Sequence, residues 1–494
     1  MLPAPEIRGI YRTDARARAA YAEAAGIYRI VPSAVVLPAD VEDLRRLICW
    51  AGEQRVTLVP RGAGSAMGGG NVGEGVVVDL TRLDNQRLEL DAPGRGAIAG
   101  AAITLDALNE GASVHRLRLP PDPSSGRWAT LGGMVSTNAA GPRSVRYGSV
   151  RRWVNALSLI TAEGEIATLR RGMPEASGGS AAVSRFERDV AARLREAGPL
   201  IRSRFPHARK NSSGYALDAY LASGDVLDLV IGSEGTLGIV TEVEWRLDPI
   251  PSYRAGLRVA LGSLDLLSYT VNALAGSQPS AVELLDRTFL DLISSERKVG
   301  AALRFPGAQA VLLVELERES ESALRAALEE ATARVRPLAQ AVDTAFSPAA
   351  AERLWGIRHA ASPLIANLPE SRRSLQVIED ACVPVDRMGD YISRVRAAAE
   401  RRDIPLVMFG HAGDGHIHVN LLPEVGSAGW EQEVSALLEE VTELVVELGG
   451  TPSGEHGDGR LRAHALRRVY GDEIVDLFRK VKTAFDPRGI FNPG

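Results

Sequence analysis

The chain reads Val56-Thr57-Leu58-Val59-Pro60-Arg61-Gly62-Ala63-Gly64-Ser65-Ala66-Met67-Gly68-Gly69-Gly70, an apolar run that leads directly into a glycine-rich loop. Glycine accepts positive φ and lets a ligand approach the backbone closely. Such loops after strands often bind phosphate, because free N–H groups converge on an anion. A flexible surface loop is the alternative, and glycine content alone does not decide between the two. The loop does not match the Gly-x-Gly-x-x-Gly dinucleotide fingerprint, which opens a helix and is followed by an acidic ribose ligand.

Strand and helix patterns alternate around this loop. Residues 35–37, 56–60 and 76–80 are apolar runs of strand length. Residues 41–48 carry apolar side chains at helical spacing, and Asp40 is placed to cap the helix. The order strand, helix, strand predicts a βαβ-like unit that ends in the glycine loop.

Two further segments are dense in small residues, at 130–141 and 231–241. Three such segments in one half of a protein are more than structural turns require. They indicate a binding site for a large, flat cofactor. Pro249-Ile250-Pro251 then marks a boundary, which predicts two domains, 1–248 and 249–494. Beyond it, amphipathic helices are predicted over residues 263–274, 319–335, 388–401 and 429–448.

Composition limits the class of protein. The formal charge of −5 and the pI near 6.0 argue against nucleic-acid binding. We expect neither a signal peptide nor a membrane-spanning segment. The two cysteines, Cys49 and Cys382, cannot ligate an iron–sulfur cluster alone and are expected to be buried thiols in a reducing cytosol.

Four of the eight histidines lie in two short stretches, Gly410-His411-Ala412-Gly413-Asp414-Gly415-His416-Ile417-His418 and Gly454-Glu455-His456-Gly457-Asp458-Gly459. The Gly-Asp-Gly turn can bring His411 and His418 to one point, and Glu455 would complete a two-His, one-carboxylate set that suits Zn²⁺, Mn²⁺ or Fe²⁺. The alternative is that these residues only hydrogen-bond within glycine turns. His456 is predicted to face another part of the cleft, because neighbours in an extended segment point to opposite sides.

These segments together resemble the vanillyl-alcohol oxidase / p-cresol methylhydroxylase superfamily of flavoproteins, and within it the D-2-hydroxyacid dehydrogenase branch. The resemblance runs from about residue 35 to the end. The motifs that carry it are 60–65, 131–141, 232–238, 410–418, 453–459 and Phe485-Asp486-Pro487-Arg488-Gly489-Ile490-Phe491-Asn492-Pro493-Gly494. It implies an α+β chain with a p-cresol methylhydroxylase-type FAD-binding domain and a FAD-linked oxidase C-terminal domain, an antiparallel sheet with helices.

The same resemblance implies FAD binding through the glycine segments and the C-terminal tail. Relatives that attach the flavin covalently use a His where this chain has Ser65, so the flavin is expected to be non-covalent. The cofactor residues it implies are Pro60, Arg61, Gly62, Ala63, Gly64, Ser65, Pro121, Asp122, Leu131, Gly132, Gly133, Ser136, Thr137, Asn138, Gly141, Glu234, Gly235, Gly238, Ile239 and Asn492.

The resemblance assigns metal binding to His411, His418 and Glu455, and the general-base role to His456; a fourth-ligand role for His456 stays open. His416 stands where many relatives have Asn, and it is either a rival ligand or a hydrogen-bonding neighbour. Asp414 and Asp458 are predicted to stabilise their own turns.

Substrate contacts are implied for Arg358, Ser362 and Asn420. Some D-2-hydroxyglutarate-specific relatives carry a lysine at the position of Ile378, so a monocarboxylate such as lactate or glycolate fits better, with the diacid as the alternative. Lys210 belongs to a motif found in relatives, without an assigned role.

The predicted function is therefore FAD-dependent oxidation of a small D-2-hydroxy acid. Electrons would pass to an iron–sulfur subunit, a cytochrome or a quinone, because the chain has no cysteine cluster. A flavin electron-relay subunit and a metallohydrolase are the alternatives. A cytoplasmic location is expected; association with the inner face of the membrane and a homodimer stay open.

Overall fold

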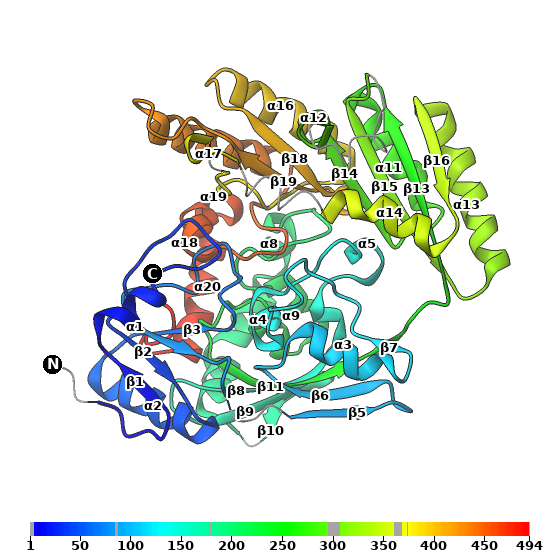
Figure 1. The fold of residues 1–494 in the computed structure, drawn as a ribbon. Coiled ribbons are helices and arrows are strands. Elements are labelled where there is room, and N and C mark those ends of the chain that lie inside the picture. Colours follow the sequence, from blue (N-terminus) through cyan, green and yellow to red (C-terminus); the bar gives the residue numbers. More distant parts are fainter. Residues whose placement is uncertain are drawn as a thin grey trace.

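A computed structural model describes residues 4–83, 87–177, 179–294, 307–359, 368–372 and 374–493. The N-terminal half holds a four-stranded sheet, a six-stranded sheet and a small two-stranded one, and the C-terminal half holds a seven-stranded sheet, called the third sheet below, beside them (Figure 1). Ser362, a predicted substrate residue, lies outside the described residues. Among the described residues, no helix combines the length and the apolarity needed to cross a membrane.

The first sheet contains the predicted βαβ-like unit. Its strands run in the order β1 (Ile10–Arg12), β2 (Ala34–Leu37), β4 (Val76–Asp79) and β3 (Leu58–Arg61). The pairs β2–β4 and β3–β4 are parallel. Helix α2 (Val41–Gln54) connects β2 to β3, and Asp40 caps it by accepting a hydrogen bond from the Asp43 N–H at 2.9 Å. The prediction for this region is confirmed, and β3 ends where the glycine loop begins.

One cysteine prediction is wrong. Cys382 is buried, but Cys49 is exposed. Helix α2 buries Leu44, Leu47 and Ile48 against the first sheet. Position 49 is one residue, or about 100° of rotation, past Ile48, which turns the thiol toward solvent.

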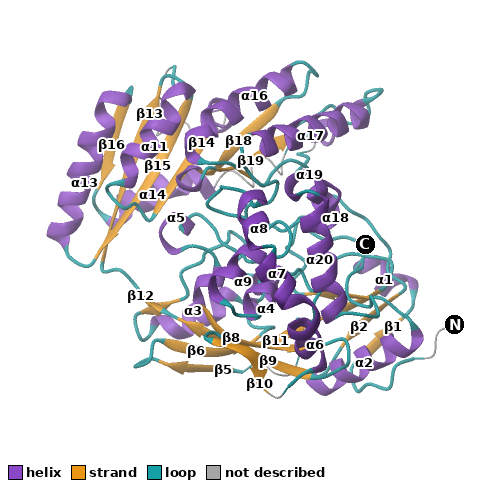
Figure 2. Ribbon diagram, turned by 180° about the vertical axis from the view of Figure 1, so that it is seen from behind, coloured by secondary structure: helices purple, strands orange, loops and turns teal. Residues whose placement is uncertain are grey.

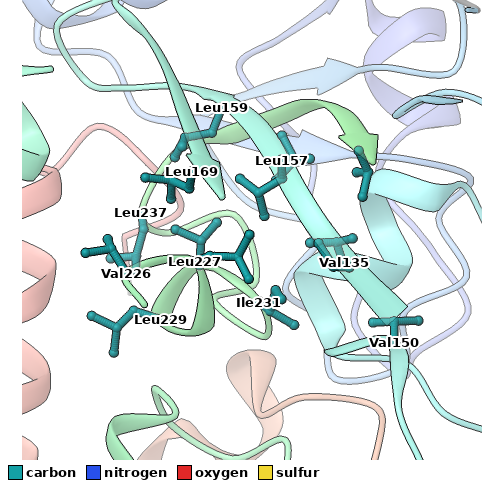
Figure 3. Close-up of a cluster of buried hydrophobic side chains, with 14 of the residues drawn as sticks. Val135, Val150, Leu157, Leu159, Leu169, Val226, Leu227, Leu229, Ile231 and Leu237 are labelled. Carbon is teal, nitrogen blue, oxygen red and sulfur yellow. The ribbon is translucent and has the colours of Figure 1, made fainter. Parts of the chain in front are cut away.

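The second sheet is antiparallel and carries the largest core. Its order is β10 (Met173–Ser177), β9 (Ile166–Arg170), β8 (Val154–Ile160), β11 (Ile239–Arg246), β6 (Gly96–Gly100) and β5 (Leu88–Asp91). Short helices cover one face of it (Figure 2). Leucine and valine side chains from β8, β9, α4 and α10 interlock there, as Figure 3 shows. The N-terminal helices are α1 (Ala15–Ala20), α3 (Leu105–Ser113), α4 (Leu131–Thr137), α5 (Ser144–Tyr147), α6 (Ala181–Phe186), α7 (Ala192–Glu196), α8 (Gly198–Arg204), α9 (Leu217–Ser223) and α10 (Leu227–Val230).

The chain leaves this half after β12 (Asp248–Pro249), which pairs with β7 (Leu117–Arg118), and enters the third sheet. That sheet has the order β16 (Ala341–Ala345), β13 (Tyr253–Leu261), β15 (Ala310–Arg318), β14 (Ala281–Asp286), β18 (Leu406–His411), β19 (His416–Leu421) and β17 (Ala381–Cys382). Every named pair in it is antiparallel.

Helices cover the outer face of the third sheet, while its other face turns toward the N-terminal half (Figure 1). The outer helices are α11 (Leu267–Ala275), α13 (Glu321–Val335), α16 (Met388–Glu400) and α17 (Trp430–Glu447). They confirm the four amphipathic segments predicted from the sequence. The remaining helices of this half are α12 (Arg287–Ser294), α14 (Pro348–His359), α18 (Gly459–Arg462) and α19 (Leu466–Tyr470).

The last helix, α20 (Asp472–Phe485), returns to the N-terminal half and packs in its core through Ile474, Phe478 and Phe485. The residues after it reach the first sheet. The N–H of Leu58 donates to the carbonyl of Ile490 at 2.7 Å, and the N–H of Asn492 donates to the carbonyl of Leu58 at 2.8 Å. The two halves therefore share chain segments as well as a surface.

Candidate active site

One cavity lies between the glycine segments of the N-terminal half and the inner face of the third sheet. It encloses about 1680 Å³ of empty space, including its open mouth. Its walls contain residues of both halves, which places the glycine loops and the histidine cluster in one site.

Most predicted cofactor residues line this cavity, among them the loop from Pro60 to Ser65. Five do not: Pro121, Asp122, Leu131, Asn138 and Asn492 lie behind its walls. They hold the wall in place. Asn492, for example, donates from Nδ2 to the carbonyls of Gly70 and Glu234, and Asn138 adopts the left-handed conformation that ends α4.

The glycine loop has the features of an anion-binding backbone. Within the described part of the chain, the N–H groups of Gly62, Ala63, Gly64 and Ser65 find no acceptor. Gly64 has a φ of 76°, which a side chain would strain. A Cβ on Gly62 would approach Oγ1 of Thr130 to 2.4 Å. Free donors on a backbone too crowded for side chains fit the pyrophosphate of a dinucleotide such as FAD.

The histidines come from a hairpin, and its register puts them on one face. Strands β18 and β19 pair Phe409 with His418 and His411 with His416, so all four side chains share the inner face of the sheet. Asn420, two residues beyond His418, lies on the same face. The turn between the strands is a short 3₁₀ helix, Ala412–Asp414, closed by Gly415 at a φ of 74°.

His411, His418 and Glu455 converge on one point. The Nε2 atoms of the two histidines are 3.3 Å apart, and Oε1 of Glu455 is 3.2 Å and 3.8 Å from them. The other ring nitrogens are taken: Nδ1 of His411 faces Oε1 of Glu283 at 2.6 Å, and Nδ1 of His418 faces the carbonyl of Glu379 at 2.9 Å. In the neutral rings those acceptors place the protons on Nδ1, which leaves both Nε2 lone pairs facing the carboxylate.

Three lone-pair donors in such proximity repel one another unless a proton or a metal cation lies between them. Burial alone would lower the pKa of His411, but the carboxylates of Glu283 and Glu455 outweigh it and raise that pKa. Burial raises the pKa of Glu455, yet Lys210 and the neighbouring histidines hold it well below its ordinary value. The donor set, two imidazoles and one ionised carboxylate with their outer nitrogens already hydrogen-bonded, suits a divalent metal.

Glu455 offers only one oxygen to this point. Its Oε2 accepts hydrogen bonds from Nζ of Lys210 at 3.0 Å and from the N–H of Gly141 at 2.9 Å. Lys210 is buried. It therefore fixes the carboxylate and neutralises it, a function that the sequence did not indicate.

His416 has no free nitrogen for a metal. Its Nδ1 lies 3.3 Å from Nζ of Lys210, and its Nε2 lies 2.9 Å from Oδ1 of Asp380. An ammonium can only donate, so Nδ1 accepts and Nε2 carries the proton. Burial, together with the charge of Lys210, lowers the pKa of His416 to about 3. His416 lies within ligand distance of the cluster. Its hydrogen bonds nevertheless make it a neutral link between Lys210 and Asp380.

His456 lines the cavity with Glu455, but the extended backbone predicted for these two residues is wrong. Residues 454–456 form a bend instead of an extended strand. Nε2 of His456 is 3.8 Å from Oε1 of Glu455, and its ring stacks on that of His418 at 5.6 Å. Nδ1 faces Oε2 of Glu379 at 2.8 Å. Burial lowers the pKa of His456, but Asp380 and Glu379 outweigh it and raise that pKa to about 10.

The two aspartates of the glycine turns bond elsewhere than predicted. Asp414 accepts from the hydroxyl of Ser144 at 2.6 Å, and Asp458 accepts from the N–H of Gly214 at 2.7 Å. Both partners belong to the N-terminal half. These carboxylates therefore join the halves of the molecule and do not close their own turns.

Arg358 and Asn420 both line the cavity. Arg358 is buried, its Nε donates to Oε2 of Glu283 at 2.8 Å, and its guanidinium carbon lies 4.6 Å from the centre of the Phe409 ring. Oδ1 of Asn420 accepts from Ser374 and Gln376. Its buried Nδ2 has no partner in the described residues, so it offers a donor to a ligand.

Ile378 is not part of the cavity. Its side chain is buried in the core of the C-terminal half, and the wall near Asn420 is made by Gln376 and Phe409. The absence of a lysine at position 378 therefore says less about the substrate than the sequence suggested. Among the described residues, Gln376 and Phe409 line the cavity together with Arg358.

Comparisons with known proteins agree with this architecture. A family model described as "FAD binding domain" matches residues 32–170, and one described as "FAD linked oxidases, C-terminal domain" matches residues 250–494. The glycolate oxidase subunit GlcD of Bacillus subtilis is 32% identical, over 94% of this chain and 89% of its own length. The D-lactate dehydrogenase of Archaeoglobus fulgidus is 31% identical, over 93% and 90%.

Among solved structures, the 4-ethylphenol oxidase of Gulosibacter chungangensis superposes with a TM-score of 0.70 at 14% identity, over 98% of this chain and 93% of its own. At that identity the likeness concerns the fold alone. The fold is thus the predicted α+β arrangement, a p-cresol methylhydroxylase-type FAD-binding domain followed by an antiparallel sheet with helices. The chain belongs to the FAD-linked oxidase family of flavoprotein oxidoreductases.

Proposed function

We propose that the protein oxidises a small D-2-hydroxy acid with one carboxylate, such as D-lactate or glycolate, to the 2-oxo acid. The observation that carries this proposal is the single cavity in which the flavin-type glycine loop and the set His411, His418, Glu455, His456 and Arg358 meet. The relatives named glycolate oxidase subunit and D-lactate dehydrogenase support the same class of substrate.

Substrate binding would use two groups on the cavity wall. Arg358 supplies a guanidinium whose Nε is already held by Glu283, so its Nη atoms remain to bind a carboxylate. Asn420 supplies the unpaired amide donor. Gln376 and Phe409, which line the cavity in the described part of the chain, are uncharged, and this favours a substrate without a second carboxylate.

His456 would take the hydroxyl proton of the substrate. Its Nδ1–H donates to Glu379, which leaves Nε2 as the atom that accepts the proton. FAD, held by the glycine loop from Pro60 to Ser65, would supply the acceptor for the hydride of the substrate Cα, at flavin N5. The substrate thereby loses one proton and one hydride, the hydride carrying both electrons, and the hydroxyl carbon becomes a carbonyl.

A divalent metal, Zn²⁺, Mn²⁺ or Fe²⁺, would be held by His411, His418 and Glu455 and would act as a Lewis acid on the substrate hydroxyl. Its charge has a second effect. Without it, Glu379 and Asp380 keep His456 protonated at neutral pH. The charge of a metal held by His411, His418 and Glu455 would lower that pKa and favour the base form of His456.

The electrons would leave the flavin for a separate acceptor, which is an iron–sulfur subunit, a cytochrome or a quinone. The proposed location of the enzyme is the cytoplasm or the inner face of the membrane. The two cysteines lie far from each other in sequence, and neither belongs to a cluster with metal-ligand spacing.

The test is anaerobic reduction of the bound flavin by a panel of D- and L-2-hydroxy acids, with and without a chelator. Bleaching by D-lactate or glycolate is expected without any partner protein, which separates a dehydrogenase from a flavin relay subunit. No bleaching by any D-acid contradicts the proposal, and bleaching unaffected by the chelator contradicts its metal.

A further inference from the structure

One buried carboxylate contacts two different parts of the site. Glu283 lies on β14, is 0% exposed, and divides its oxygens between two partners. Oε1 is 2.6 Å from Nδ1 of His411, and Oε2 is 2.8 Å from Nε of Arg358. We propose that Glu283 is a positioning residue that fixes the metal-binding His411 and the carboxylate-binding Arg358 in one relation to each other. The inference rests on the function proposed above and deepens it.

The sheet itself holds Glu283 in this place. Strand β14 pairs with β18 through Leu284–Gly410 and Leu285–Phe409. The same antiparallel register sets position 283 directly opposite position 411, where side chains on one face are nearest neighbours. Val282 and Leu284 point to the opposite face, into the apolar core. The backbone on both sides is thus fixed, which keeps the Glu283 side chain on the same face of the sheet as His411.

The contact with His411 decides which nitrogen faces the metal position. A carboxylate can only accept, so Nδ1 of His411 carries the proton and Nε2 presents its lone pair. Outer carboxylates of this kind orient a ligand and make it more basic, and their loss commonly weakens metal binding about 10- to 100-fold.

The contact with Arg358 decides which edge of the guanidinium is free. Nε is used by Glu283, and the guanidinium carbon lies 4.6 Å from the Phe409 ring centre. In the described part of the chain, Nη1 and Nη2 have no acceptor. The plane and the free edge of the group are therefore both set before a substrate arrives.

A 2-hydroxy acid has its hydroxyl and its carboxylate on adjacent carbons. A site that grips both at once needs a fixed spacing between the metal and the guanidinium. Glu283 provides that spacing with a single side chain. Its loss should accordingly disturb metal affinity and substrate affinity together, although it contacts neither.

The experiment compares Glu283→Gln with Asp286→Asn in the flavin-loaded protein. Gln has the same shape but one acceptor oxygen, so it cannot serve both partners. Asp286 is a matched control, because it lies on the same strand, is equally buried and pairs with Arg396 away from the cavity. Zn²⁺ affinity is measured by chelator competition, substrate-site affinity by the flavin absorbance change on titration with acetate, and KM and kcat by flavin turnover.

For Glu283→Gln we expect a zinc affinity lower by about 10-fold or more, together with weaker acetate binding and a raised KM for the hydroxy acid. Asp286→Asn should change none of these, and Glu283→Asp, which keeps both acceptor oxygens, should recover part of each loss. Arg358→Gln should weaken acetate binding and leave zinc affinity unchanged.

A Glu283→Gln protein that loses only one of the two affinities, or neither, overturns the inference while the proposed function stands. If Glu283→Gln fails to fold, Glu283→Asp decides alone: wild-type values for both affinities contradict the inference, and a joint loss supports it. If the wild-type protein binds no zinc and no D-2-hydroxy acid reduces its flavin, the proposed function itself fails.

Discussion

The Nη2 atom of Arg118 lies 3.0 Å from Oε2 of Glu317, and this ion pair joins the two halves of the molecule. Arg118 belongs to β7 and Glu317 to β15, and Tyr147 donates its hydroxyl to the same oxygen at 2.7 Å. Burial raises the pKa of Glu317, but Arg118 and Tyr147 outweigh it and lower that pKa to about 2.

This contact should make the protein sensitive to acid. Because the folded-state pKa is depressed from its ordinary 4.5, the stabilisation is complete above that value and is lost as the pH falls toward about 2. Glu317→Gln should lose about 3 kcal/mol of unfolding free energy at pH 7 and show a flatter decline in acid, as measured by urea unfolding across pH. Glu319→Gln, at an exposed neighbour, should behave like the wild type. If the unfolding free energy of Glu317→Gln falls with pH as steeply as that of the wild type, Glu317 is not the source of the acid sensitivity.

Removing one imidazole from the cluster should remove the metal. His411→Ala leaves one imidazole and one carboxylate at the position where three donor atoms converge. We expect metal content, measured by elemental analysis, and flavin reduction to fall together, while flavin content stays at the wild-type level. His464→Ala, at an exposed histidine, is the control, and full activity in metal-depleted His411→Ala would refute the role.

Lys210→Met tests the group behind Glu455. The substitution leaves Oε2 of a buried carboxylate with only the Gly141 N–H as a partner. An uncompensated buried charge costs about 3–5 kcal/mol, so we expect a lower melting temperature that added Zn²⁺ restores in part. If Zn²⁺ raises the melting temperature of the variant no more than that of the wild type, Lys210 has no role at the metal site.

His456→Ala should abolish flavin reduction and leave both flavin and metal bound. In the wild type, the raised pKa of His456, to about 10, means that the base form grows as the pH rises. The rate constant of flavin reduction should therefore increase with pH, and added metal should shift that rise to lower pH. A rate independent of pH, in stopped-flow measurements with saturating substrate, would argue against His456 as the base.

The flavin should leave the protein on denaturation. Ser65 stands in the glycine loop where relatives with a covalent flavin have a histidine, and a serine hydroxyl does not form that link. Acid precipitation should release all yellow colour into the supernatant. Flavin retained in the pellet would contradict non-covalent binding.

The sequence predicted what depends on neighbouring residues. The strand, helix and glycine loop of the first sheet follow from local patterns, and the hairpin of His411 and His418 follows from a Gly-Asp-Gly turn and the alternation of strand side chains. The family resemblance added the flavin and the order of the two domains.

The supporting groups depend on contacts between distant segments and were missed. Glu283 meets His411 across 128 residues, and Lys210 meets Glu455 across 245. The only local signal was a Glu inside the apolar strand 281–286, since a buried carboxylate is costly unless it is paired. The error at residues 455–456 had the same origin, because the bend there is held by the distant carboxylate of Asp380.

The return of α20 to the N-terminal half has a consequence for synthesis of the protein. Phe478 and Phe485 complete the first large core, and the segment around Phe491 completes the sheet edge next to Leu58. Domains normally fold in order as they leave the ribosome. Here the half that is translated first completes its core only after residues 472–491 have been translated, so we expect flavin loading to follow the synthesis of that segment.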